Sequence, residues 1–540
     1  MKTKKAMKKI THIGMAALVA MGMLGTSCNK AESPEIETPE TQKENIVTLT
    51  TTVGFAADGT KALTDNGVKT FAVDETMVLR YKNTKDDWVM AVSNALEAKD
   101  IAVGSKSATF TFTLTNPDKT KNVDYIYPAA IVNPLGNVNE SALFGSQDGT
   151  LNKIASTFDY SRKIGSWDGE NLPSLTLENQ LAILAITLKN ADGSSDITSS
   201  ITGLTLSDGT KTYNVSRSAA AGPIYVAIFP TADATITVTA TDGTKNYTKT
   251  LTSKTYAKGN GYPVSWKMTQ VPTDLSTLTA AYTAQDGDIL TGTLGSNVKI
   301  SIADGATVTL NNVTINGTND YDYEWAGITC LGNATIILSG TNTVKGFYEN
   351  YPGIQAAAGK TLTINGTGSL TASSNGYSAG IGGGSGVACG NIEIQGGTIT
   401  ATGGERGAGI GGAYNASCGT ITISGGTVTA TGGQYGAGIG GGRRHTANVS
   451  CGNILISGGT VTATGGDGAA GIGGGRGNNS TYKSRCGTIT ITTGVTKVTA
   501  KKGSDATNSI GAGQLGTCGT VTIGGNVGAI TTSPYTYQPE

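Results

Sequence analysis

The stretch "GGQYGAGIGGG" at residues 432–442 decides the fold, because near-copies of it return along the C-terminal half of the chain. The copies read "GYSAGIGGGSG" at 376–386, "RGAGIGGAYN" at 406–415 and "GAAGIGGGRGNN" at 468–479. A glycine-rich loop can cradle a phosphate, but that site needs a Lys followed by Ser or Thr, or a single strand–loop–helix unit, and neither is present. Self-similarity at a regular spacing instead indicates a repeat architecture.

Cysteine–glycine pairs give the length of the repeat. They begin at Cys389, Cys418, Cys451, Cys486 and Cys518, so successive units span 29, 33, 35 and 32 residues. Cys330 lies about two units before Cys389, and Ala358-Gly359 takes the intermediate place. Each unit holds three short strand-like segments and no helical periodicity. We therefore predict an all-β fold here, a parallel β-helix with one coil per ~30 residues and a coil spacing of about 4.8 Å.

Stacked coils would align equivalent side chains in columns along the axis. Apolar residues recur at matching places: Ile392, Ile394, Ile421, Ile423, Ile454 and Ile456 on the first strand, Ile399, Val428 and Val461 on the second, and Ile410, Ile439 and Ile472 on the third. Such columns would fill an interior that one unit alone could not build. The glycines fall where the chain turns corners and a Cβ would collide.

The cysteines and histidines give no metal motif. The sequence has no CxxC pair, and His445 is the only histidine beyond the leader. A calcium-binding β-roll would need an aspartate at a fixed offset from the glycines, which the copies lack. We expect the repeated cysteines to form an inward column of free thiols, with disulfides as the alternative.

The N-terminus has the layout of a secretory signal. Residues 1–27 begin with five lysines, continue with "IGMAALVAMGMLG", and are followed by Cys28. The small residues before Cys28 resemble a bacterial lipobox, although Leu24 stands one place further out than usual; the resemblance implies cleavage and acylation of Cys28. Residues 28–45 are rich in Pro, Glu, Ser and Thr and predict a flexible tether.

The charge pattern excludes a nucleic-acid partner. The chain has 39 basic and 39 acidic residues, and removal of the lysine-rich leader leaves an acidic excess with no basic cluster of the necessary size. No other stretch is long and apolar enough to span a bilayer. The predicted contact with a membrane is therefore the lipid anchor on Cys28.

Short strands separated by turn signals fill the region before the repeats. "ATFTFTLTN" alternates apolar residues with threonine, and Asp-Gly pairs at Asp208-Gly209 and Asp242-Gly243 predict hairpins. This pattern is typical of β-sandwiches. We predict two sandwiches, at residues 46–171 and 172–271.

This region resembles the fimbrillin-like surface proteins of Bacteroidales. The likeness rests on "DYIYPAA" at 124–130, "LENQLAILAITLKN" at 177–190, "IYVAIFPT" at 224–231 and "YAKGNGYPVSWKM" at 256–268. It implies transthyretin-like sandwiches, a role in adhesion and fimbrial partner subunits. Fimbrillins that polymerise are cut after an Arg near the first strand, whereas the first Arg beyond the leader here is Arg80. A stalk or an accessory adhesin therefore fits better.

The second region, residues 272–533 with a tail at 534–540, resembles the bacterial parallel β-helix carbohydrate-binding domain. The resemblance runs from "DILTGTLGSNVKISIADGATVTLNNVTING" at 288–317 through "GITCLGNATIILSGTNTVKG" to the glycine-rich coils. It implies binding of polysaccharide or host glycan, with calcium in some cases.

Aromatic residues near the corners are the candidate glycan contacts, because exposed rings offer apolar faces to sugars. They would line one edge of the solenoid together with one arginine: Tyr321, Tyr323, Trp325, Tyr348, Tyr351, Tyr377, Arg406 and Tyr435. The alternative is that the rings of the first coils only cover the mouth of the β-helix. Asp320, Asp322 and Glu324 are weak candidate calcium ligands, with solvated loop charges as the alternative; no other cofactor is expected.

We predict no enzymatic activity. β-Helix lyases and hydrolases need converging carboxylates or a calcium cluster beside a base, and the central coils show isolated charges such as Glu393. The Thr rows on the strands would also suit ice binding, but threonine is an ordinary β-former. The sequence favours a lipid-anchored, surface-exposed outer-membrane adhesin that binds glycan. The alternatives are a protein-binding adhesin or accessory fimbrial subunit and, less favoured, a β-helix lyase or hydrolase.

Overall fold

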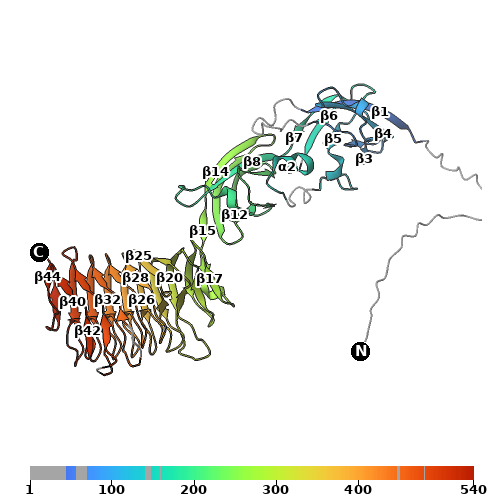
Figure 1. Cartoon of the computed structure of the whole chain (residues 1–540). Coiled ribbons are helices and arrows are strands. Elements are labelled where there is room, and N and C mark those ends of the chain that lie inside the picture. The colour runs from blue at the N-terminus through green and yellow to red at the C-terminus, as the bar shows by residue number, and fades with distance from the viewer. Residues whose placement is uncertain (1–43, 56–69, 140–146, 159, 447–449, 480) are drawn as a thin grey trace, which may run out of the picture.

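The structure is a computed structural model that describes residues 44–55, 70–139, 147–158, 160–446, 450–479 and 481–540. Two β-sandwiches and a parallel β-helix follow one another in an elongated arrangement, with the β-helix at the C-terminal end (Figure 1). The predicted leader, Cys28 and all but the last two residues of the tether lie outside the described residues. In the described part, no helix has the length and apolar character that a bilayer crossing requires.

The first sandwich is built from one seven-stranded sheet in the order β3-β2-β5-β6-β7-β1-β4. Its strands are β1 (Ile46–Phe55), β2 (Val78–Lys82), β3 (Trp88–Val92), β4 (Ser107–Thr115), β5 (Val123–Tyr127), β6 (Ser161–Gly165) and β7 (Leu175–Asn179). The alternating Phe110, Phe112 and Leu114 of β4 face a core that also takes side chains from β2 and β5. The period-two pattern in the sequence thus becomes one buried face and one exposed face.

The second sandwich has a five-stranded sheet, β10-β9-β12-β13-β15, packed on a three-stranded sheet, β11-β8-β14. Its strands are β8 (Ala182–Lys189), β9 (Gly203–Ser207), β10 (Thr212–Ser216), β11 (Ile224–Ile228), β12 (Thr231–Thr241), β13 (Asn246–Tyr256), β14 (Gly261–Lys267) and β15 (Thr269–Val271). Both Asp-Gly pairs join antiparallel neighbours, β9 to β10 and β12 to β13, so the predicted hairpins are confirmed.

The seam between the sandwiches differs from the predicted 171/172. Strand β7 lies beyond that point, yet it pairs with β1 and β6 of the first sheet. The chain crosses to the second sandwich at Gln180-Leu181, where Asn179 Oδ1 accepts a hydrogen bond from the Leu181 N–H at 2.9 Å. The apolar run "LENQLAILAITLKN" continues through this turn, so the sequence carries no composition change there.

The two sandwiches share an apolar cluster. It joins Val78 and Ile126 of the first to Ile183 and Ala227 of the second, with Ile154 from the short helix α2 (Leu151–Thr157) between them. Buried Gln147 also bonds both backbone groups of Ala227 through its side-chain amide, at 2.8 Å each. Short 3-10 turns complete the connections: η1 (Ala98–Asp100), η2 (Ala129–Ile131), η3 (Thr198–Ser200) and η4 (Leu275–Thr277).

The β-helix has parallel rows of strands that pair from coil to coil. The first strands of the coils are β22 (Ala334–Ser339), β25 (Thr361–Gly366), β28 (Asn391–Ile394), β31 (Ile421–Ile423), β35 (Ile454–Ile456), β39 (Ile489–Ile491) and β43 (Val521–Ile523). The second are β23 (Thr341–Lys345), β26 (Ser369–Ser373), β29 (Thr398–Thr402), β32 (Thr427–Thr431), β36 (Thr460–Thr464) and β40 (Lys497–Lys501). The third are β17 (Tyr282–Ala284), β19 (Ile300–Ile302), β21 (Ile328–Cys330), β24 (Ile354–Gln355), β27 (Ile381–Gly382), β30 (Ile410–Gly411), β33 (Ile439–Gly440), β37 (Ile472–Gly473) and β41 (Ile510–Gly511).

The register confirms the predicted apolar columns. Ile392 pairs with Ile421 and Ile421 with Ile454 on the first strands, while Ile410, Ile439 and Ile472 stack on the third. All of these side chains are buried in one continuous core. The β-helix therefore gains its interior by repetition, as the spacing predicted.

Corner glycines have no room for a side chain. Gly440 has a φ of +132°, and an added Cβ would lie 2.0 Å from the carbonyl oxygen of Gly473 in the next coil. The "AGIGGG" motif is thus a tight corner repeated at each coil, which explains its return along the chain.

The cysteines stack as predicted with one exception. Cys418 pairs with Cys451, Cys451 with Cys486 and Cys486 with Cys518, and all of these thiols are free. Two short strands of this row, β38 (Ser484–Cys486) and β42 (Gly516–Cys518), follow β34 (Ser450–Cys451). Cys330 instead belongs to the third row, where it pairs with Ile302, and burial raises the pKa of its thiol to about 12. Its spacing from Cys389 matched two repeats only by coincidence.

Both ends of the β-helix are covered. The first coils begin with β16 (Thr273–Asp274), β18 (Ile289–Thr293) and β20 (Ala306–Ile315), and Lys245 of the second sandwich bonds the Asp286 carbonyl beside them. At the other end, β44 (Asn526–Val527) folds back on β43. The predicted tail at 534–540 contains β45 (Tyr535–Tyr537), which pairs antiparallel with β40.

Candidate functional site

Two columns of residues run side by side along one edge of the β-helix. The first contains the predicted Tyr377, Arg406 and Tyr435, each four residues before the isoleucine of its third strand. The second lies four residues after that isoleucine and contains Tyr414, Arg443 and Arg476. Backbone bonds tie each first-column residue to the second-column residue of the next coil: Tyr414 N to Tyr377 O at 3.0 Å, Arg443 N to Arg406 O at 2.8 Å, and Arg476 N to Tyr435 O at 3.1 Å.

Side chains of the two columns stack on one another. The Arg406 guanidinium carbon lies 4.4 Å from the ring centroid of Tyr377 and 4.7 Å from that of Tyr414. The Tyr377 and Tyr414 centroids are 6.0 Å apart. A guanidinium held over two rings gains cation–π attraction and loses rotational freedom.

The same stacking recurs one coil later, but there one tyrosine ring lies between two arginines instead of one arginine between two tyrosines. The guanidinium carbons of Arg443 and Arg476 lie 4.3 and 5.2 Å from the Tyr435 centroid. Arg476 also donates to Asp467 at 2.8 Å, and Asp467 accepts from the Ser504 hydroxyl. That hydroxyl and the nearby guanidinium lower the pKa of Asp467, so the carboxylate is ionised at neutral pH.

We call these six residues the Tyr–Arg ladder: Tyr377, Arg406, Tyr414, Tyr435, Arg443 and Arg476. All are half-buried, so part of each side chain remains accessible. Sequence reasoning found the first column and missed the second, although its constant offset of four residues after Ile410, Ile439 and Ile472 was a usable signal. The variable loops that follow the corner concealed it.

The rings of the first coils form a separate cluster. Tyr323 and Trp325 lie 6.4 and 5.8 Å from Phe347, which is 1% exposed, and both pack against the core of the β-helix. Tyr321 is instead 71% exposed. Tyr323 and Trp325 therefore contribute to packing and are half-buried, whereas Tyr321 is the exposed ring of this loop; ligand contact by all three stays a prediction.

Tyr348 and Tyr351 lie between the first-coil cluster and the ladder. Desolvation and the carboxylates of Glu349 and Glu324 raise the pKa of Tyr348, and desolvation and Glu324 raise that of Tyr351. Both phenols therefore stay neutral at physiological pH and can donate hydrogen bonds.

The acidic residues of the first loop do not converge. Among the described residues, no group of three or more His, Cys, Asp or Glu side chains is placed to hold a metal ion. Asp320 instead accepts a hydrogen bond from the Asp322 N–H at 3.0 Å, which closes a local turn. Asp320 thus contributes to the structure of its own loop, and calcium binding by Asp320, Asp322 and Glu324 stays a prediction.

A family model described as a β-helix repeat matches the chain at residues 362–385, 392–414, 421–443 and 454–476. These four matches cover the coils that carry the Tyr–Arg ladder. No curated protein sequence matches the chain significantly.

Similar solved structures include a fimbrial assembly protein from Parabacteroides distasonis. It is 13% identical over 41% of this chain and 92% of that one, with a TM-score of 0.25. A putative cell adhesion protein from Bacteroides fragilis is 12% identical over 38% of this chain and 84% of that one, with a TM-score of 0.24. A fimbrial protein from Bacteroides ovatus is 15% identical over 42% of this chain and 50% of that one, with a TM-score of 0.22.

Proposed function

We propose that the protein is a non-enzymatic cell-surface adhesin whose β-helix binds a glycan along the Tyr–Arg ladder. The observation that carries this proposal is the interleaving of three tyrosines and three arginines from successive coils on one accessible edge. Packing of the core does not explain why tyrosine and arginine occupy these positions, because the core beneath them is already filled by isoleucine, valine and alanine.

The ladder has the chemistry that a saccharide needs. Tyrosine rings present apolar surface to sugar C–H groups, and phenol and guanidinium groups can exchange hydrogen bonds with sugar hydroxyls or carboxylates. Stacking fixes the guanidinium groups before a ligand arrives, which lowers the entropy lost on binding. The spacing repeats with the coils, so a chain of sugar units is a better match than a single sugar.

The proposal includes an anchor and a stalk. Cys28, outside the described residues, would carry the lipid that holds the protein to the outer membrane. The two sandwiches share the Ile126–Ile183 apolar cluster and would act as one spacer. The β-helix stands at the end of the described chain away from β1 (Figure 1), as expected of a presented binding module.

The test is a glycan array with the whole protein, followed by titration of the best ligand. We expect Tyr435→Ala to weaken binding at least about tenfold, which corresponds to about 1.4 kcal/mol. Thr429→Ala is the matched control, because it trims an exposed side chain on the sheet face of the same coil and should leave affinity unchanged. Tyr435→Phe should retain most of the affinity if the ring face makes the contact.

Three results would contradict the proposal. One is that the protein binds no glycan but binds another protein tightly, which would favour a protein-binding adhesin or an accessory fimbrial subunit. Another is equal weakening by Tyr435→Ala and Thr429→Ala. The third is release of reducing ends or unsaturated uronides from a polysaccharide, which would show that the β-helix is an enzyme. Trp325→Ala is a poor probe, since its ring packs against Phe347 and the core.

A further inference from the structure

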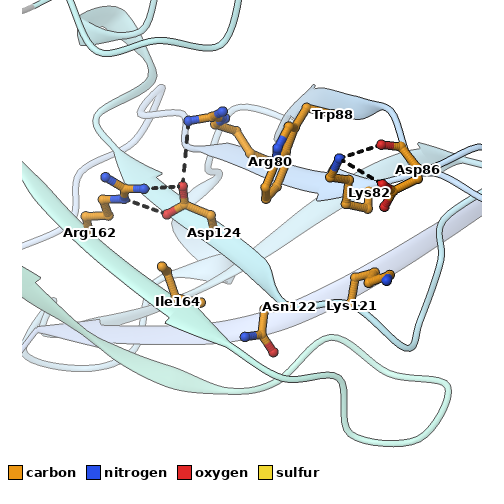
Figure 2. Close-up of a pocket in the computed structure, with 9 residues that line it drawn as sticks. All are labelled: Arg80, Lys82, Asp86, Trp88, Lys121, Asn122, Asp124, Arg162 and Ile164. Atoms are coloured by element: carbon orange, nitrogen blue, oxygen red, sulfur yellow. Dashed lines mark hydrogen bonds and ion pairs between the residues drawn. The ribbon is translucent and has the colours of Figure 1, made fainter.

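A separate site, which is concave, lies on the first sandwich, far along the chain from the ladder. It is a cavity of about 490 Å³ on the outer face of β2, β3, β5 and β6, within the size range of small-ligand sites (Figure 2). Nine residues line it: Arg80, Lys82, Asp86, Trp88, Lys121, Asn122, Asp124, Arg162 and Ile164.

One buried carboxylate organises the floor of this cavity. The Asp124 side chain is 4% exposed and accepts two hydrogen bonds from Arg162, both at 2.8 Å. Arg80 lies 3.9 Å from Asp124 Oδ2, the oxygen that also accepts a hydrogen bond from Arg162 (Figure 2). Two guanidinium groups thus share one negative charge, and the bidentate pair with this buried carboxylate orients Arg162.

Trp88 on β3 contacts two cationic side chains of the neighbouring strand β2. Trp88 is 54% exposed and stands between Arg80 and Lys82, each with its charged group 5.1 Å from the ring centroid (Figure 2). Lys82 also bonds the backbone carbonyl of Asp86 and lies 3.6 Å from its carboxylate. The ring therefore spaces the two cations and keeps them at the rim of the cavity.

The charge of the lining favours an anionic ligand. Four cations, Arg80, Lys82, Lys121 and Arg162, face two carboxylates, Asp86 and Asp124. The remaining lining groups are the Asn122 amide and the exposed apolar surfaces of Trp88 and Ile164, the latter 53% exposed. A ligand with a negative group, hydroxyls and an apolar face would contact all three kinds of surface.

The sheet topology disfavours an extended peptide in this cavity. Strand β2 pairs with β3 and β5, and β5 pairs with β2 and β6, so their backbone groups are already used. A peptide could not add beside β2 or β5 as a further strand, which is the usual way that a sheet binds one; β3, at the edge of the sheet, lines the cavity through the Trp88 side chain. Recognition over the floor of the cavity must therefore come from side chains, as in sugar-binding sites.

We propose that this cavity binds a carboxylate-bearing sugar unit of an acidic polysaccharide. The carboxylate would bind between Arg80 and Lys121, and the ring would lie toward Trp88 and Ile164. The site is independent of the Tyr–Arg ladder and would give the protein two separate contacts with glycans.

The test is titration of the whole protein with an oligogalacturonate, a neutral oligogalactose and an oligoglutamate of equal charge. We expect binding of the oligogalacturonate alone, weakened by added salt. Arg80→Gln should reduce its affinity at least about tenfold, and Lys121→Gln, which changes an exposed side chain, about threefold. Lys85→Gln is the matched control, because it removes another exposed lysine charge, from the neighbouring turn outside the cavity.

Four outcomes would overturn the proposal. The first is that the oligogalacturonate does not bind, and the second is that the oligoglutamate binds equally or more tightly. The third is an equal loss of affinity in Lys85→Gln and Lys121→Gln. The fourth is binding of the oligogalacturonate that is lost in Tyr435→Ala but not in Arg80→Gln. The last would place the ligand on the ladder, so failure here leaves the proposed function of the β-helix separately testable.

Discussion

The sandwiches and the β-helix solve the same packing problem in different ways. In the first sandwich, β1 pairs with β4 and β7, so each core residue meets neighbours of other types from distant parts of the chain. In the β-helix, a residue meets its own counterpart one coil away, as Ile410 meets Ile439. The sandwich interior is a set of unlike contacts, whereas the β-helix interior is one contact repeated.

This difference also separates the two proposed sites. The cavity of the first sandwich combines side chains from strands far apart in sequence, such as Arg80 on β2 and Arg162 on β6. The Tyr–Arg ladder takes one residue per column from each coil, so its spacing is set by the repeat. A repeat can thus lengthen a binding edge simply by adding coils.

The largest expected effect is at a stacked corner. Gly440→Ala would force a Cβ to 2.0 Å from the Gly473 oxygen at a φ of +132°, so we expect a loss of about 3–5 kcal/mol in unfolding free energy. Gly243 in the β12–β13 turn also has a positive φ, +96°, but open space around it, so Gly243→Ala should cost about 1–2 kcal/mol. Denaturant unfolding of both variants checks this, and similar losses would refute the role assigned to stacking.

The next prediction concerns how far the destabilisation caused by a core substitution extends through the structure. Ile439→Ala and Leu184→Ala each remove a side chain with 0% exposure and should each cost about 2–5 kcal/mol. In the β-helix the loss should stay near the altered coil, because each coil contacts only its neighbours. Hydrogen exchange should therefore accelerate around β30, β33 and β37 for Ile439→Ala, but across the whole second sandwich for Leu184→Ala. Uniform acceleration along the β-helix would contradict this view.

The smallest expected effect is electrostatic. The pKa of Asp467 in the ladder region is lowered by the Ser504 hydroxyl and Arg476. At the Asp242 turn of the second sandwich, desolvation raises the pKa of the carboxyl. Hydrogen bonds from Lys245, Thr244 and Tyr247 lower this pKa by more, so the net shift is also downward.

A carboxyl with a lowered folded-state pKa stabilises the protein above its unfolded value near 3.8, and this stability is lost as the pH falls through the lower folded value. Asp467→Asn and Asp242→Asn should therefore each reduce stability by at most about 1 kcal/mol at pH 7 and by less below pH 3.8. Unfolding of each variant at pH 7 and pH 3 checks the sign. A larger effect at pH 3 than at pH 7 would contradict it.

Repetition explains how much the sequence could predict. The apolar columns, the glycine corners and Tyr377, Arg406 and Tyr435 were readable because one coil reports on the next. The seam at Gln180 and the row of Cys330 could not be predicted, since each depends on how a loop or a turn lies locally. The second column of the ladder had a sequence signal in its constant offset from the isoleucines, but the variable loops concealed it. The cavity on the first sandwich gave no signal, because its residues share no spacing and only pairing of β2, β5 and β6 brings them together.

Removal of one whole coil tests most directly the claim that the binding edge is built by stacking. Deletion of residues 410–438 joins Gly409 to Ile439, the counterpart of Ile410, and removes Tyr414 and Tyr435 from the ladder. We predict that this variant still unfolds cooperatively but loses glycan affinity, whereas deletion of residues 410–424, about half a coil, unfolds the C-terminal half. Equal behaviour of the two deletions, or unchanged glycan affinity after loss of the whole coil, would contradict the account.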